Sequence, residues 1–189
     1  MIKNDPKTTA LVMIDLQKGI LNVPLAPGSA NAVLAAAESW IGWFHALQPT
    51  VILTRVRWAN SFADALNQPV ERPMAQSVLP PEWAELPSEL ELSDNDVIVQ
   101  TAQWVTSYGT KLNLQLRRRE IRTIVLGGIA TDVGVESTAR DVWERNYELI
   151  FAEGTMAILS RLYASVFDQH NLSHVKSGVC FEYNSQRNW

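Results

Sequence analysis

Short apolar runs alternate along this chain with segments of helical periodicity, and this alternation constrains the fold more than any other feature. We expect strands at residues 9–15, 50–56, 96–100, 122–129 and 147–153, and a short sixth strand at 177–183. The helices are expected at residues 30–47, 111–119, 132–146 and 160–174. Continuous apolar strands that alternate with helices are typical of βαβ units, whose strands are parallel and buried on both faces. The pattern therefore predicts an α/β protein.

The chain shows no sign of a second domain. Its 189 residues contain no internal repeat, low-complexity tract or shift in composition, so we expect one domain over residues 1–189. The irregular segment 57–95 carries several prolines. A connection of this length inside a compact domain is usually a lid, a pocket wall or a docking surface.

Charge and hydropathy argue against two kinds of partner. A formal net charge of −4 does not favour a nucleic-acid surface, and the basic cluster Arg117–Arg119 is better interpreted as the solvated end of a helix. No run of some 18 apolar residues and no apolar leader is present, so we expect no membrane partner and a cytoplasmic protein.

The residues that commonly bind metals are few and scattered. The single cysteine, Cys180, cannot form an internal disulfide, and no Cys/His group has zinc-ligand spacing. His170 and His174 lie four residues apart and could form a metal pair, but a helix face is the favoured interpretation. We therefore expect neither a metal nor a cofactor.

In open parallel sheets, ligands bind outside the carboxyl ends of the strands. That rule selects Asp15, Arg55, Thr101 and the small-residue turn 128–134. A carboxylate that ends an apolar strand is costly to bury unless it is hydrogen-bonded, paired or used in chemistry. Two interpretations of Asp15 stay open: a functional carboxyl group, or a cap for the turn at residues 17–19.

The stretch GGIATDVGVESTAR, residues 127–140, follows the fourth strand and opens a helix. Its small residues would let the backbone approach a ligand, and free amides at the start of the helix could form an oxyanion hole. Alternatively, Thr131 or Asp132 is simply the N-cap of a structural helix. The stretch does not match the dinucleotide fingerprint G-x-G-x-x-G, so a phosphate cradle is weakly supported.

Three segments together carry a resemblance to a known family: TALVMIDLQKGIL, YGTKLNLQL and GGIATDVGVESTARDVWERNYELIFAEG. They resemble the isochorismatase-like hydrolases, and most closely the uncharacterised YecD-like branch, over residues 9 to about 157. The resemblance implies a Rossmann-like three-layer αβα sandwich around a six-stranded, mostly parallel sheet.

The cysteine hydrolases of that family use an Asp–Lys–Cys triad beside a non-proline cis peptide that shapes the oxyanion hole. Matched position by position, the resemblance assigns Asp15 to the triad aspartate, Thr101 to the lysine position and Gly134 to the cysteine position. The cis bond would join Ile129 and Ala130, and the amides of Ala130 and Gly134 would form the oxyanion hole.

A glycine in place of the cysteine excludes a thioester intermediate. Cys180 is a poor substitute, since its apolar terminal segment suggests a core residue, and Lys111 is expected to face solvent. The resemblance offers another chemistry: isochorismatases of this family also carry glycine there. They hydrolyse a vinyl ether with the aspartate as general acid, which requires a carboxyl group with a raised pKa.

These observations favour a hydrolase that acts on a small, anionic metabolite by acid/base rather than covalent catalysis. Asp15 would transfer protons, and the substrate would be bound by Ala130, Gly134, Arg55, Thr101 and Trp104. The alternatives are a ligand-binding protein without turnover and an assembly protein, to which the seven tryptophans could contribute as interface residues. The resemblance also implies a homo-oligomer, a dimer or a tetramer.

Overall fold

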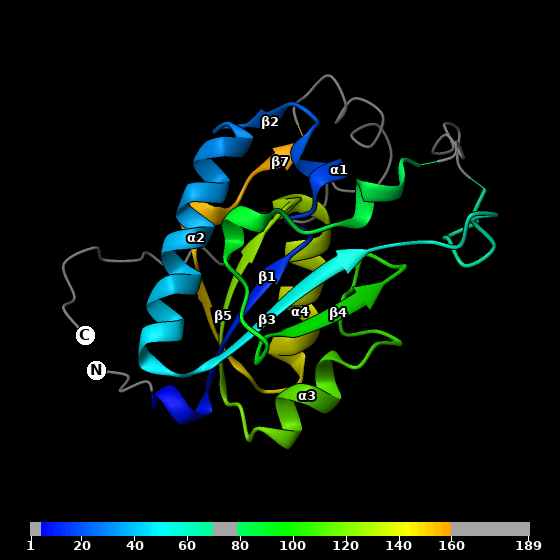
Figure 1. Cartoon of the computed structure of the whole chain (residues 1–189). Helices are drawn as coiled ribbons and strands as arrows, with labels where there is room; N and C mark the ends of the chain where they lie inside the picture. Colours follow the sequence, from blue (N-terminus) through cyan, green and yellow to red (C-terminus); the bar gives the residue numbers. More distant parts are fainter. Residues whose placement is uncertain (1–4, 70–78, 160–189) are drawn as a thin grey trace.

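A five-stranded parallel sheet forms the centre of the computed structural model, which describes residues 5–69 and 79–159. The strand order is β4-β3-β1-β5-β6, with β1 in the middle (Figure 1). The strands are β1 (Thr9–Ile14), β3 (Thr50–Val56), β4 (Val97–Thr101), β5 (Thr123–Gly128) and β6 (Glu148–Phe151). All six residues of β1 are buried, as expected for an apolar strand between two helical layers.

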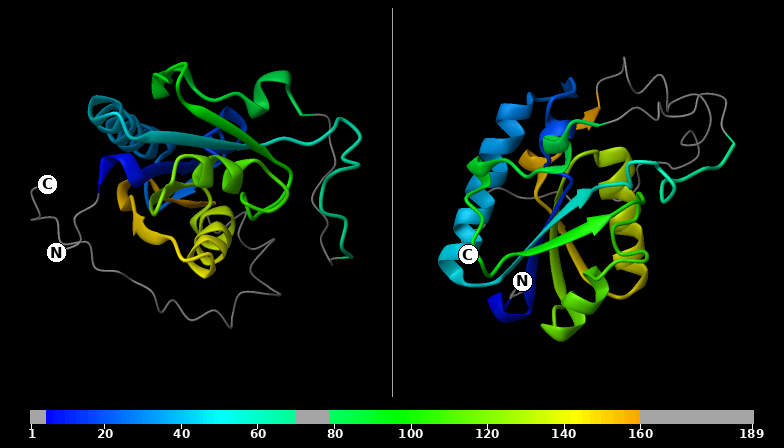
Figure 2. Two further views of the ribbon diagram at one scale, coloured as in Figure 1. Left: turned by 90° about the horizontal axis from the view of Figure 1, so that it is seen from below. Right: turned by 45° about the vertical axis from the view of Figure 1, so that its right-hand side comes forward.

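Helices cover both faces of the sheet and complete three layers. Figure 2 shows α2 (Ala30–Leu47) on one face and α4 (Glu136–Glu144) on the other, and the shorter α3 (Leu112–Arg118) lies on the same face as α4. Each face has its own apolar core, because successive strand residues point to opposite sides. Leu11 and Met13 pack with α2, whereas Ala10 and Val12 pack with α3 and α4. The predicted α/β sandwich is confirmed.

Local signals set the ends of α2. The Ser29 side chain accepts a hydrogen bond from the Ala32 amide at 3.2 Å, which satisfies an otherwise free donor of the first turn. At the other end Gln48 adopts a left-handed conformation directly before Pro49. Between these ends a single stripe is buried, made of Val33, Ala37, Ile41 and Phe44.

The sheet differs from the six-stranded prediction. The described residues contain five parallel strands, and the predicted sixth strand at 177–183 lies outside them, as do the predicted helix 160–174, His170, His174 and Cys180. A separate antiparallel pair joins β2 (Leu25–Ala26) to β7 (Ile158–Leu159). Two-residue strands are too short to show alternation, so the sequence pattern did not predict this pair.

The helix predicted at 132–146 is two elements. A π-helical turn over Thr131–Val135 leads into α4, which ends at Glu144. The cap position of this turn is Ala130, and no side chain caps it, so the interpretation of Thr131 or Asp132 as an N-cap is wrong. A π-turn has one more residue than an α-helical turn, and such turns are frequent at functional sites.

Candidate active site

Asp15 follows the last residue of the central strand and lies at its carboxyl end, with 9% of its surface exposed. Its φ angle of 51° is left-handed, which turns the chain away from the strand direction. On the neighbouring strand, the Thr54 hydroxyl donates a hydrogen bond to the Asp15 carboxylate at 2.8 Å. The same hydroxyl accepts the Asp15 backbone N–H at 3.2 Å. Thr54 therefore holds both the main chain and the side chain of Asp15.

Burial controls the acidity of this carboxyl group. It raises the pKa of Asp15 from 3.8 to about 7, and the hydrogen bond from Thr54 opposes that rise only in part. Near neutral pH the protonated and ionised forms are thus both populated. A group in that state can give up a proton in one step of a reaction and take one back in another.

Gln17 fixes the carboxyl end of β1 to that of β3. Its side chain is fully buried, and its amide nitrogen donates to the carbonyl groups of Val56 at 3.0 Å and Trp83 at 3.3 Å. Its amide oxygen accepts the Val56 N–H at 2.7 Å. The Gln17 side chain thus bonds to the backbone of β3 beyond Met13 and Leu53, the last residues that pair between β1 and β3.

The turn-capping interpretation of Asp15 is not what the structure shows. Within the described residues, the carboxylate forms its hydrogen bond with Thr54, and α1 (Lys18–Leu21) has no side-chain cap. Thr54 was not predicted from the sequence, and Gln17 was predicted only as part of a turn. The signal for both was a polar residue within or directly after an otherwise apolar run.

Two glycines at the end of β5 serve packing rather than ligand approach. A Cβ on Gly127 would lie 1.9 Å from the Thr155 hydroxyl oxygen, and a Cβ on Gly128 would lie 2.1 Å from the Ile14 carbonyl oxygen. Gly128 also has a φ of 118°, which residues with a side chain rarely adopt. Gly127 lets Thr155 pack directly on β5, and Gly128 lets the end of β5 lie close against Ile14, directly before Asp15.

Gly134 lies in the π-helical turn and faces the carboxyl group. A Cβ at this position would lie 3.8 Å from Asp15 Oδ2, 3.8 Å from the Trp104 carbonyl oxygen and 3.0 Å from a methyl group of Ile14. A side chain here would therefore enter the space beside Asp15. The structure thus brings together Asp15, Gly134 and the backbone of Trp104.

The other edge of this site is formed by the chain directly after β5. The Ile129–Ala130 peptide bond is cis, at the position where the resemblance places such a bond. The Ala130 amide donates no hydrogen bond to another described residue, whereas the next amide, that of Thr131, donates to the Ala157 carbonyl at 3.0 Å.

Thr101 and Trp104 lie beyond the end of β4. The Thr101 hydroxyl donates to the Gln103 carbonyl at 3.1 Å and accepts the Gln103 N–H at 3.0 Å, which closes a tight turn. Thr101 is 3% exposed and belongs to β4, two strands away from Asp15. The Trp104 side chain is 52% exposed. The Trp104 carbonyl oxygen faces Gly134, at 3.8 Å from where a Cβ would lie there, so the Trp104 backbone lies on the same side of the turn as the Asp15 carboxyl group.

Arg55 follows Thr54 in β3, so its side chain leaves the opposite face of the sheet. It lines a hollow of about 470 Å³ together with Gln100 and Lys111, and Asp15 is not among the lining residues. The Arg55 side chain therefore leaves the sheet on the face opposite Thr54 and lines the same hollow as Lys111.

Aromatic side chains lie beyond the ends of β3 and β4. The ring centroid of Trp58 is 5.8 Å from that of Phe62 and 5.7 Å from that of Trp83. The Trp58 indole donates to the Ala102 carbonyl at 3.0 Å, and the Trp83 ring packs directly on Gly19. This group belongs to segment 57–95 and covers the chain that follows Asp15.

The described residues contain no group of three or more His, Cys, Asp or Glu side chains placed to hold a metal ion. Nor does any helix among them have the length and apolar composition required to span a bilayer.

A five-stranded parallel sheet between two helical layers, with a buried carboxyl group at the end of its central strand, places the chain in the Rossmann-like α/β class. Residues 9–171 match the family model "Isochorismatase domain". The chain belongs to the isochorismatase family.

Individual relatives agree with this assignment. The chain is 44% identical over 173 residues to the uncharacterised isochorismatase family protein YecD of Escherichia coli O157:H7, covering 92% of this chain and 89% of YecD. It is 32% identical over 177 residues to the ureidoacrylate amidohydrolase RutB of Methylorubrum extorquens, covering 80% and 71%. A solved isochorismatase family structure from Burkholderia thailandensis superposes with a TM-score of 0.79 at 36% identity, covering 90% and 89%.

Proposed function

We propose that this protein is a hydrolase for a small anionic metabolite, in which Asp15 transfers protons and no covalent enzyme intermediate forms. The observation that carries the proposal is the Asp15 carboxyl group, whose pKa burial raises to about 7. Gly134 faces this group without a side chain, at the position where the resemblance puts a nucleophilic cysteine. The site thus offers a proton donor and free space, which is what a reaction without a protein nucleophile requires.

Hydrolysis of a vinyl ether fits this arrangement. The protonated Asp15 would donate its proton to the terminal carbon of the C=C bond, which leaves an oxocarbenium ion. Water adds to that cation, and the resulting hemiketal breaks its C–O bond to release an alcohol and a ketone. The proton lost by the added water returns to the carboxylate, so Asp15 acts first as acid and then as base.

The remaining residues would position the substrate. The Ala130 amide, which donates to no other described residue, can bind an anionic oxygen beside Asp15. The exposed Trp104 and the aromatic group of Trp58, Phe62 and Trp83 would form apolar walls. Thr54 would keep the carboxyl group in place during both proton transfers.

The amidohydrolase name of the relative RutB motivates a second candidate, hydrolysis of a small amide. In that case Asp15 would act as a general base that activates water. The two chemistries differ in pH dependence: the acid mechanism is fast below the pKa of Asp15 and slows above it, and the base mechanism does the reverse.

The test compares wild type, Asp15→Asn and Asp94→Asn on a panel of vinyl ethers and small amides over a range of pH. Asp94 is an exposed loop carboxylate, so its variant is a matched control with the same change of charge. We expect turnover to fall by about 10²–10⁴-fold in Asp15→Asn and to stay unchanged in Asp94→Asn. Turnover that survives Asp15→Asn would overturn the proposal. Ligand-induced thermal stabilisation without any turnover would support a binding protein instead.

A further inference from the structure

The hollow at the β4 edge of the sheet is a second place where the chain can bind a ligand. Arg55 and Gln100 are register partners on β3 and β4, so their side chains leave the same face, as does that of Ile98. The segment that leads into α3 supplies the rest of the wall. The six lining residues are Arg55, Ile98, Gln100, Gly109, Thr110 and Lys111.

The charges in this hollow are unbalanced. Two cations line it and no carboxylate does. Among residues 5–69 and 79–159, the buried Arg55 Nε has no hydrogen-bond partner, and neither Arg55 nor Lys111 forms an ion pair with an acid. A buried donor without a partner costs free energy, and a bound ion or water is one common explanation for such an atom.

The polar groups of the wall indicate the chemistry of the ligand. The Thr110 hydroxyl is already used, because it donates to the Thr106 carbonyl and accepts the Leu112 N–H. The free donors are the guanidinium of Arg55, the ammonium of Lys111 and the exposed amide of Gln100. A planar guanidinium matches two oxygens of a carboxylate or phosphate, and a nearby ammonium balances a second negative charge.

We propose that this hollow is a binding site for a small oxyanion with two negative charges, separate from the Asp15 site. The ligand is held by Arg55 and Lys111, with Gln100 as a further donor. This inference does not depend on the proposed hydrolase function, since neither Asp15 nor Gly134 lines the hollow. A phosphate group and a dicarboxylate share the required charge.

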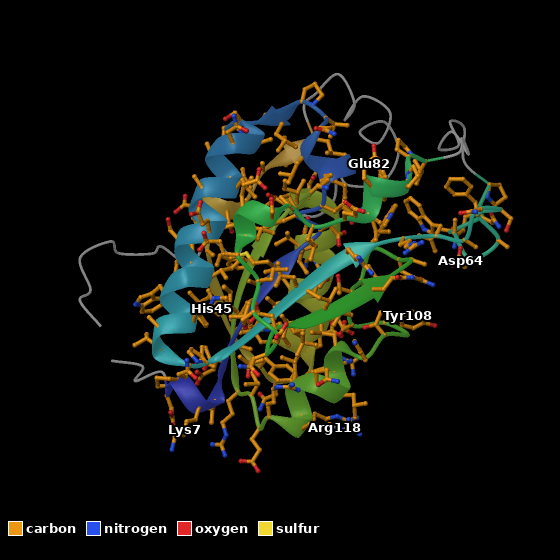
Figure 3. All side chains as sticks on the ribbon, viewed as in Figure 1. Lys7, His45, Asp64, Glu82, Tyr108 and Arg118 are labelled. Atoms are coloured by element: carbon orange, nitrogen blue, oxygen red, sulfur yellow. The ribbon has the colours of Figure 1, made fainter. Side chains whose placement is uncertain are left out.

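Calorimetric titration can test the site with inorganic phosphate and, separately, with succinate, in a buffer that contains no other oxyanion. We expect one saturable site for at least one probe, and the tighter of the two identifies the class of ligand. Arg55→Gln and Lys111→Gln should each weaken binding by about tenfold or more. Arg118→Gln is the matched control, because Arg118 lies on the outer side of α3 (Figure 3) and is exposed. It should bind within about twofold of wild type.

Two further variants complete the test. Asp15→Asn shows whether the anion binds in this hollow or in the Asp15 site, and Arg55→Met shows whether Arg55 binds the anion or only stabilises the fold. Asp15→Asn should bind the probe as wild type does, and loss of binding in that variant would place the anion in the hydrolytic site instead. Arg55→Met should not lower Tm in the absence of anion, because the buried Nε has no hydrogen-bond partner among the described residues. No saturable binding of either probe, or equal binding in wild type, Arg55→Gln and Lys111→Gln, would overturn the proposal.

Discussion

The adjacent strands β1 and β5 end at the same edge of the sheet, yet they contribute to the site in opposite ways. The end of β1 contributes side chains, Asp15 and Gln17, both buried and both hydrogen-bonded to β3. The end of β5 and the π-helical turn after it contribute glycines: Gly127 and Gly128 allow close packing, and Gly134 leaves space beside Asp15. The β1 end thus supplies the buried carboxyl group, and Gly134, in the turn after β5, leaves the space beside that group free of a side chain.

The strongest test of the β5 end is Gly128→Ala. The new Cβ would lie 2.1 Å from the Ile14 carbonyl oxygen, and φ would stay at 118° only under strain. We expect a loss of about 3–5 kcal/mol of unfolding free energy, the sum of strain and overpacking. Urea denaturation measures this loss. Gly42→Ala, at an exposed helix position with nothing within 4 Å, is the control and should gain about 0.5–1 kcal/mol. Equal stability of the two variants would contradict the steric role of Gly128.

At the β1 end, Gln17→Leu keeps a side chain of similar volume and removes the amide that bonds to the Val56 backbone. The Val56 N–H and carbonyl then lose buried partners, so we expect a loss of about 2–4 kcal/mol in the unfolding free energy. Lys18 provides a contrast one residue later. Its ion pair with Glu85 is 2.7 Å long but exposed to solvent, which screens the two charges, so Lys18→Met should leave the unfolding free energy nearly unchanged in the same denaturation assay. If the Gln17 variant is as stable as the Lys18 variant, the hydrogen bonds of Gln17 do not stabilise the carboxyl ends of β1 and β3.

The raised pKa of Asp15 makes stability depend on pH. Between the unfolded pKa of 3.8 and the folded pKa of about 7, the native state binds more protons than the unfolded state, so stability falls as pH rises. From pH 5 to pH 8 we expect this group alone to remove about 2.5 kcal/mol. Asp15→Asn should lack that decrease and should therefore be the more stable protein at pH 8. Chemical denaturation of both proteins at pH 5 and pH 8 measures this difference in unfolding free energy. If the free energy of the two proteins changes with pH in parallel, Asp15 is not the group that titrates.

Much of this comparison could be read from the sequence. The apolar run before Asp15 located the central strand, and the rule for parallel sheets placed Asp15 and the turn after β5 at one edge. Arg55 could not be placed in the same way. The register that pairs Arg55 with Gln100 is set by long-range contacts, and so is the position of Lys111, the residue before α3 that lines the same hollow.

The roles of the glycines were also beyond the sequence. Gly127 and Gly128 carry no pattern that tells close packing from ligand approach, because either requires only a missing side chain. Their neighbours Thr155 and Ile14 are brought there by tertiary structure. The role of Thr54 could not be predicted for the same reason. Threonine is common in strands, and only the tertiary structure shows that Asp15 lies beside it.

The smallest effect is expected at Gly134, where the two strand ends meet. A Cβ there would lie 3.0 Å from a methyl group of Ile14, which can move by a few tenths of an ångström, so Gly134→Ala should cost no more than about 1–2 kcal/mol of stability. The same methyl group would enter the space beside Asp15 without removing any donor or acceptor. We therefore expect about a tenfold fall in kcat/KM, close to 1.4 kcal/mol of transition-state stabilisation, with the pH dependence of the rate retained. Kinetics on the substrate identified for wild type measure both quantities. Full activity in Gly134→Ala would mean that the substrate does not bind in the space beside Asp15. The glycines at and after the end of β5 would then have a role in packing alone.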